Sequence, residues 1–147
     1  MRYALRAAII VWALFSAGTA FGGVQDFGPF TLSIPKGWTA EKQSEGEIVT
    51  ANVFSPDESF AFTFTLCPLM GLSLEETARS FSEGMGGTKP QLDKNGAYRF
   101  TFNEGASAAL VSGRLQELGY YMLVTMTGDV KGNLDAVNGL IDSLEIK

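Results

Sequence analysis

The sequence predicts an α+β fold, a single domain in which a central antiparallel β-sheet of about six or seven strands is flanked by helices. Alternation of apolar and polar residues recurs in several short segments, whereas helical spacing of apolar residues occurs in two segments only. Short turns, rather than helices, separate most of the strand-like segments. Clustered strands of this kind form antiparallel sheets with helices packed on them. Because no repeat, low-complexity tract or linker interrupts the pattern, one domain is predicted.

The first twenty residues have the features of a cleavable secretory signal peptide. Arg2 and Arg6 form a positive start, an uncharged run extends from Ala7 to Ala17, and Gly18-Thr19-Ala20 offers small residues for cleavage. A retained membrane anchor is the less favoured alternative, since spanning hydrocarbon takes about 20 apolar residues. A lipoprotein anchor is not expected, because no cysteine lies near the cleavage region. We therefore predict a signal peptide at 1–20 and a periplasmic or secreted domain at 21–147, with no stable membrane span after processing.

The charge of the processed chain excludes some classes of partner. Removing residues 1–20 takes away two of the 11 basic residues and none of the 16 acidic ones, which leaves a net charge of −7. The remaining Lys and Arg are scattered, so neither nucleic acid nor an anionic membrane surface is expected as a partner. The chain has no histidine, which excludes Ser-His-Asp and Cys-His catalysis and imidazole metal sites.

Three strands are predicted before the first helix. Residues Phe30–Ile34 alternate apolar and polar and end at Pro35, and Ile48–Phe54 forms the second candidate. The third, Phe60–Cys67, is the clearest, and Pro68 stops it. One face of this strand carries Phe60, Phe62, Phe64 and Leu66, and the other carries Ala61, Thr63, Thr65 and Cys67.

A helix is predicted next. Ser73 and Glu76 have the spacing of a capping box, and glycines at 84–87 end the helix. A single face of this helix gathers Leu74, Ala78, Phe81 and Met85.

Four strands and a second helix follow. Residues 88–93 contain Pro90 and predict an edge strand, and Asn95-Gly96 predicts a hairpin leading into Tyr98, Phe100 and Phe102. Segments 108–116 and 120–127 predict another hairpin, whose second arm is apolar on both faces and therefore central in the sheet. The closing segment, from about 132 to 144, predicts a helix with Leu134, Val137, Ile141 and Leu144 on one face.

Several residues have both a structural and a functional interpretation. Trp38, after the Pro35-Lys36-Gly37 turn, is either the rim of the core or an exposed anchor for a partner, and the first is favoured. The phenylalanines at 60–64 and 100–102 are expected to pack in the core rather than line an apolar pocket. Cys67 has no partner for an internal disulfide, so it is either a thiol that reacts or joins two chains, or a small buried residue, and the buried residue is favoured.

No motif in the chain predicts a catalytic, cofactor-binding or metal-binding residue. The glycines at 84–87 follow a helix and so differ from a phosphate loop. Residues 129–135 place Lys131 where a calcium loop needs a ligand. The acidic pairs Asp57-Glu58 and Glu75-Glu76 are typical of a turn and of a helix start, and Glu45 and Glu47 are expected to face water.

Residues 27–147 resemble PsbP-like and DcrB-like domains. The resemblance rests on Phe30-x-Leu32-x-Ile34-Pro35-x-Gly37-Trp38, on the strand 60–64 leading to Ser73-Leu74-Glu75-Glu76, and on Ile141-Asp142-Ser143-Leu144. It implies an α/β/α sandwich and, because its relatives are mostly docking or accessory modules, a binding role without catalysis. No catalytic motif is available to carry over, and the histidine-dependent metal binding of some relatives cannot apply to this chain.

These observations together predict an exported bacterial accessory protein, not an enzyme and without a cofactor, that docks a protein or peptide through a sheet face or its rim. A carrier of a small apolar ligand is the alternative, because Phe and Met are abundant in the predicted strands. A carboxylate-based hydrolase is less favoured, since no acidic pair stands with a nucleophile.

Overall fold

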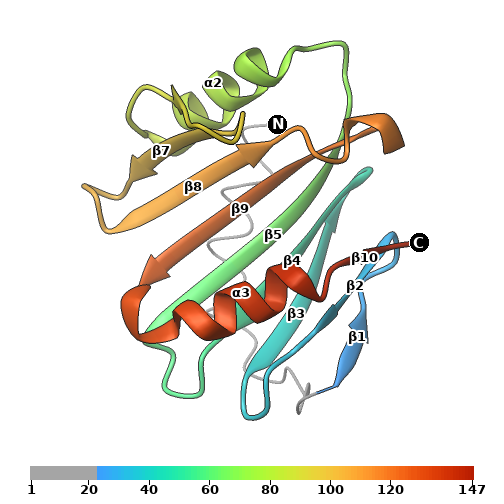
Figure 1. The fold of residues 1–147 in the computed structure, drawn as a ribbon, viewed down its shortest axis with the longest axis vertical. Helices are drawn as coiled ribbons and strands as arrows, with labels where there is room; N and C mark the ends of the chain where they lie inside the picture. The colour runs from blue at the N-terminus through green and yellow to red at the C-terminus, as the bar shows by residue number, and fades with distance from the viewer. Residues whose placement is uncertain (1–22) are drawn as a thin grey trace.

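The computed structural model describes residues 23–147, which form a single small α+β domain with two antiparallel sheets and two α-helices (Figure 1). The predicted signal peptide at 1–20 lies outside the described residues. Within them, no helix is long and apolar enough to cross a membrane.

The larger sheet has seven strands in the order β3-β4-β5-β9-β8-β7-β6. All neighbouring strands are antiparallel. The strands are β3 (Thr39–Glu45), β4 (Ile48–Phe54), β5 (Phe60–Pro68), β6 (Gln91–Leu92), β7 (Tyr98–Phe102), β8 (Ser107–Ser112) and β9 (Tyr120–Gly128). The predictions of a central strand at 120–127 and of an edge strand near Pro90 are confirmed.

A second sheet of three strands, order β1-β2-β10, is formed by β1 (Val24–Asp26), β2 (Phe30–Ser33) and β10 (Glu145–Ile146). The sequence had placed residues 30–34 in the central sheet, and that placement is wrong. β2 instead packs face-on, so that the Phe30 ring meets the Phe64 ring edge-to-face, with centroids 4.9 Å apart.

One face of the large sheet, here called the covered face, lies under the small sheet and helix α3 (Leu134–Asp142), which crosses in front of β5 and β4 in Figure 1. Because side chains alternate along a strand, the even-numbered residues of β5 point toward this cover. Phe60, Phe62, Phe64 and Leu66 are at most 2% exposed there, which confirms that they are core residues.

The opposite face, here called the second face, is partly covered by helix α2 (Leu74–Met85). The predicted capping box is present: Glu76 N–H donates to Ser73 Oγ at 3.1 Å, and Ser73 N–H donates to Glu76 Oε1 at 3.4 Å. Ala78 and Phe81 pack against apolar side chains of β7, β8 and β9, and Leu74 and Met85 pack at the edges of the same cluster. The predicted helix face is therefore confirmed.

Two predictions of local structure need correction, and one strand was missed. Leu134 is 49% exposed, and Leu140, which the sequence interpretation left out, is fully buried with Val137. Strand β8 ends at Ser112 rather than near residue 116, because a loop with the 3₁₀ helix η2 (Gln116–Leu118) follows. Strand β3 was not predicted: it is an edge strand whose polar residues show no alternation of apolar side chains.

Candidate functional site

The second face changes character along its strands. Beneath α2 it is apolar, with Leu123, Val111 and Phe100 buried in one cluster. Farther along β4, β5 and β9 the same face becomes polar. Asn52 is paired in register with Thr63, and Thr63 is paired with Thr125. Directly paired residues point to the same face of a sheet, so a polar row crosses three adjacent strands.

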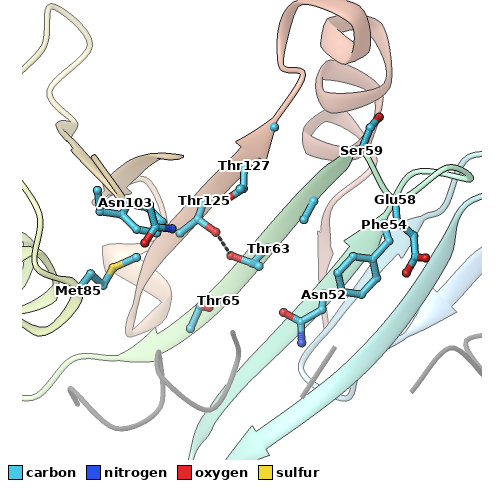
Figure 2. Close-up of a pocket in the computed structure, with 13 residues that line it drawn as sticks. Asn52, Phe54, Glu58, Ser59, Thr63, Thr65, Met85, Asn103, Thr125 and Thr127 are labelled. Carbon is cyan, nitrogen blue, oxygen red and sulfur yellow. Dashed lines mark hydrogen bonds between the residues drawn. The ribbon is translucent and has the colours of Figure 1, made fainter. Parts of the chain in front are cut away.

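This polar part of the second face contains a cavity of about 210 Å³, here called the threonine trough (Figure 2). Residues of strands β4, β5, β7 and β9, of the β4–β5 and β7–β8 turns, and of the end of α2 line it. The lining residues are Asn52, Phe54, Glu58, Ser59, Ala61, Thr63, Thr65, Met85, Phe102, Asn103, Thr125, Thr127 and Gly128.

Hydroxyl pairs between neighbouring strands organise the trough and the sheet beside it. Thr63 and Thr125 share a hydrogen bond across β5 and β9, drawn as a dashed line in Figure 2. The Thr50 and Thr65 hydroxyl oxygens are 2.9 Å apart. Each pair uses one hydroxyl hydrogen and leaves oxygen lone pairs and one hydrogen for other partners.

The rim beside β8 carries a second polar group. Asn103 Nδ2 donates to Ser107 Oγ at 3.0 Å, and Ser107 Oγ lies 2.8 Å from Thr127 Oγ1. Asn103 holds a left-handed backbone conformation (φ 52°) in the β7–β8 turn. Asparagine adopts this conformation more readily than most residues, so the turn can place the amide against the trough.

On the β4 side of the trough, polar atoms lack partners. Asn52 is 1% exposed, and neither its Oδ1 nor its Nδ2 has a hydrogen-bond partner among the described residues. Glu41, its register partner on β3, has two buried carboxylate oxygens with no partner there, and the same holds for Gln43 Oε1. A buried polar group without a partner costs about 1–3 kcal/mol, so this arrangement favours a ligand that supplies the missing hydrogen bonds.

The charge at the site is negative and comes from carboxylates. Glu58 is the charged residue that lines the trough. Burial raises the pKa of the Glu41 carboxyl above its ordinary value, since a desolvated carboxylate is less stable than a solvated one. Asp57, next to Glu58, accepts hydrogen bonds from Ser59 and Ser55, which lower its pKa and hold the β4–β5 turn.

The lining of the trough can exchange hydrogen bonds with a bound molecule. It consists of hydroxyl and amide groups, the Glu58 carboxylate and apolar walls. Among residues 23–147, no three side chains of the Cys, Asp and Glu type come together as a metal site.

Burial decides between the structural and the functional interpretation of the residues for which the sequence allowed both. Trp38 is 7% exposed and packs edge-to-face on Phe60 with ring centroids 6.0 Å apart, so it is a core residue. Cys67 is 1% exposed, as predicted. Phe100 packs beneath α2, whereas Phe102 both packs there and lines the trough.

The polar segments identified in the sequence have local structural roles. Gly86 ends α2 in the left-handed conformation (φ 68°). Asp129 Oδ1 accepts from Gly132 N–H at 3.0 Å, and the Asn133 amide donates to the Asp129 carbonyl at 2.7 Å. Glu75 pairs with Arg79 at 3.3 Å, and Glu58 is the acidic residue that belongs to the trough.

The sequence interpretation did not identify Asn52, Thr63, Thr65 and Thr125 as site residues. Their signal is present in the sequence: threonines alternate with large apolar residues in two central strands. A central strand normally has apolar residues on both faces, so hydroxyls repeated on one face favour a part of the sheet on which the apolar side of α2 does not pack.

A scan against models of known protein families finds no match for this sequence, and a search of curated proteins finds no significantly similar chain.

Proposed function

We propose that this protein is an exported, periplasmic accessory protein without catalytic activity, and that it holds a protein or peptide partner on the second face of its large sheet. The observation that carries the proposal is the threonine trough with the unpartnered Asn52 amide. Export is supported by the signal-like residues 1–20. The resemblance of residues 27–147 to PsbP-like domains supports a docking role, and we propose that the sheet with α3 on one face and α2 on the other is a PsbP-like α/β/α sandwich.

The position of the trough favours docking over catalysis. It lies on a rigid sheet, where β4, β5 and β9 fix the polar groups with respect to one another. A binding surface held in this way loses little conformational entropy when a partner binds. The trough combines hydroxyl and amide groups with apolar walls, as binding sites commonly do. Phe54, Met85 and Phe102 form these walls.

Affinity capture tests this function. The processed protein, purified from the exported fraction of its host, serves as bait for a periplasmic extract. Thr63→Phe fills the trough with a bulky side chain that strands tolerate, and Thr101→Phe makes the same change at an exposed position of β7, outside the trough.

We expect one reproducible partner with the unaltered bait and with the Thr101 variant, and a loss of that partner with the Thr63 variant. Circular dichroism and the unfolding midpoint confirm that both variants fold. Equal recovery by the two variants would contradict docking at this face, as would repeated capture of nothing by folded bait.

The carrier function for a small apolar ligand is the second candidate, because Phe54, Met85 and Phe102 line part of the trough. Native mass spectrometry of freshly purified protein distinguishes it, since a carrier would retain a non-covalent adduct. A uniformly ligand-free mass would remove this candidate.

A further inference from the structure

The unpartnered atoms beside the threonine trough are mostly acceptors. They are the two carboxylate oxygens of Glu41, Oε1 of Gln43, and Oδ1 and Nδ2 of Asn52. Four of these five atoms can only accept hydrogen bonds, and one can donate. A complementary ligand must therefore bring donors.

These three side chains lie close together on one face. Glu41 and Asn52 are directly paired between β3 and β4, and Gln43 follows Glu41 two residues along β3. Lys42, which lies between them in the sequence, points to the opposite face because side chains alternate along a strand. No lysine or arginine is among the residues that line the trough.

Building on the proposed function, we propose that the trough and its acceptor edge on β3 receive a lysine or arginine side chain from a basic segment of the partner protein. Ammonium and guanidinium groups carry N–H donors and no acceptors. Such a cation would meet the Glu41 carboxylate and the Gln43 and Asn52 oxygens, while its alkyl stem contacts the apolar trough wall formed by Phe54.

Charge and size both favour a segment of a protein as the occupant. The processed chain carries a net charge of −7, which attracts a basic partner over a range of about 10 Å in moderate salt. A cavity of about 210 Å³ has room for one long side chain rather than for a folded domain. The backbone that presents this side chain would then lie along the adjacent sheet face.

Nuclear magnetic resonance titration tests this inference on the isotope-labelled, processed protein. The probes are short capped peptides of glycine with one central Arg, Lys or Gln. We expect saturable shifts of the Asn52 side-chain amide and of the Thr63 and Thr125 signals with the Arg or Lys peptide, and at least about tenfold weaker binding of the neutral Gln peptide.

Glu41→Gln and Glu45→Gln form a matched pair, because they remove the same charge from the same strand. Glu45 is exposed at the end of β3, whereas the carboxylate oxygens of Glu41 are buried beside Asn52. We expect E41Q to weaken the cationic peptide at least about tenfold and E45Q to change its affinity by less than about twofold. Similar losses in the two variants would show long-range attraction only and would overturn the site.

Other outcomes are equally decisive. Equal affinity for the Gln and the cationic peptides, or shifts that avoid Asn52 and Thr63, would overturn the cation site. A free alkyl diamine that binds as tightly as the peptides would overturn the assignment of a protein segment as the occupant. If peptides fail to bind while Thr63→Phe still abolishes partner capture, this inference alone is wrong and the proposed docking face stands.

Discussion

Truncation of Leu140 tests how α3 packs on the covered face. Leu140 is fully buried against the aromatic core, whereas Leu134, in the same helix, is 49% exposed. The sequence pattern alone had assigned the buried face to Leu134 and omitted Leu140. Leu140→Ala and Leu134→Ala make the same chemical change at the two positions.

The expected magnitudes follow from burial. Truncating a fully buried leucine to alanine costs about 2–5 kcal/mol, because both transfer free energy and packing around the new cavity are lost. We expect about 3 kcal/mol for Leu140→Ala. The half-exposed Leu134 side chain stays largely in contact with water in the folded protein, and its truncation leaves no closed cavity. Leu134→Ala should therefore lower the free energy of unfolding by less than about 1 kcal/mol.

Urea unfolding followed by circular dichroism measures both values, provided that the slope with denaturant is unchanged. With an unfolding entropy of about 2.1 cal/mol/K per residue over about 125 residues, the Leu140 variant should lose about 10 °C in Tm and the Leu134 variant less than about 4 °C. Equal losses, or a larger loss for Leu134→Ala, would refute the packing of α3 described above.

Three further perturbations probe other parts of the fold. Ser73→Ala removes the capping-box acceptor and should lower the free energy of unfolding by about 1 kcal/mol in urea titrations. Gly128→Ala should prevent stable folding, because the φ of Gly128 is +100° and an added Cβ would collide with the Ser59 carbonyl. Gly139→Ala should raise Tm slightly, because Gly139 lies in α3 with open space around it and alanine restricts the unfolded chain more than glycine does. Hydrogen bonds from the Arg99 side chain and from two backbone amides lower the pKa of Asp93 below its ordinary value of 3.8. The stability that the Asp93 carboxylate contributes is therefore complete above pH 3.8 and is lost as the pH falls through the folded-state pKa. Asp93→Asn should flatten the profile of Tm against pH between about pH 5 and pH 2, and an unchanged profile would refute that role.

Local sequence was sufficient for those elements whose signals are short-range. The capping of α2 by Ser73 and Glu76 and the turn at Gly96 depend on residues within a few positions of one another. The alternation in β5 requires burial of Phe60, Phe62 and Phe64 whatever covers them. These features were predicted correctly because local backbone geometry and the pleat determine them.

The candidate site could be predicted only in part. Thr63 and Thr65 were assigned correctly to one face of their strand, but tertiary contacts decide how far α2 extends over that face. That depends on where a helix formed by residues 74–85 comes to rest across β7 and β8. Strand β3 shows the same limit, because its seven residues are held by backbone pairing with β4 rather than by an apolar pattern of their own.

The sequence by itself determined an acidic, histidine-free chain with a signal-like start and alternating strands that require an antiparallel sheet. Only the tertiary structure decided that residues 30–33 leave the large sheet to pair with the chain end, and that Asn52, Thr63 and Thr125 meet in one row. The physical reason is that side-chain period fixes the face on which a residue lies, whereas strand order and helix placement depend on contacts between residues far apart in the chain.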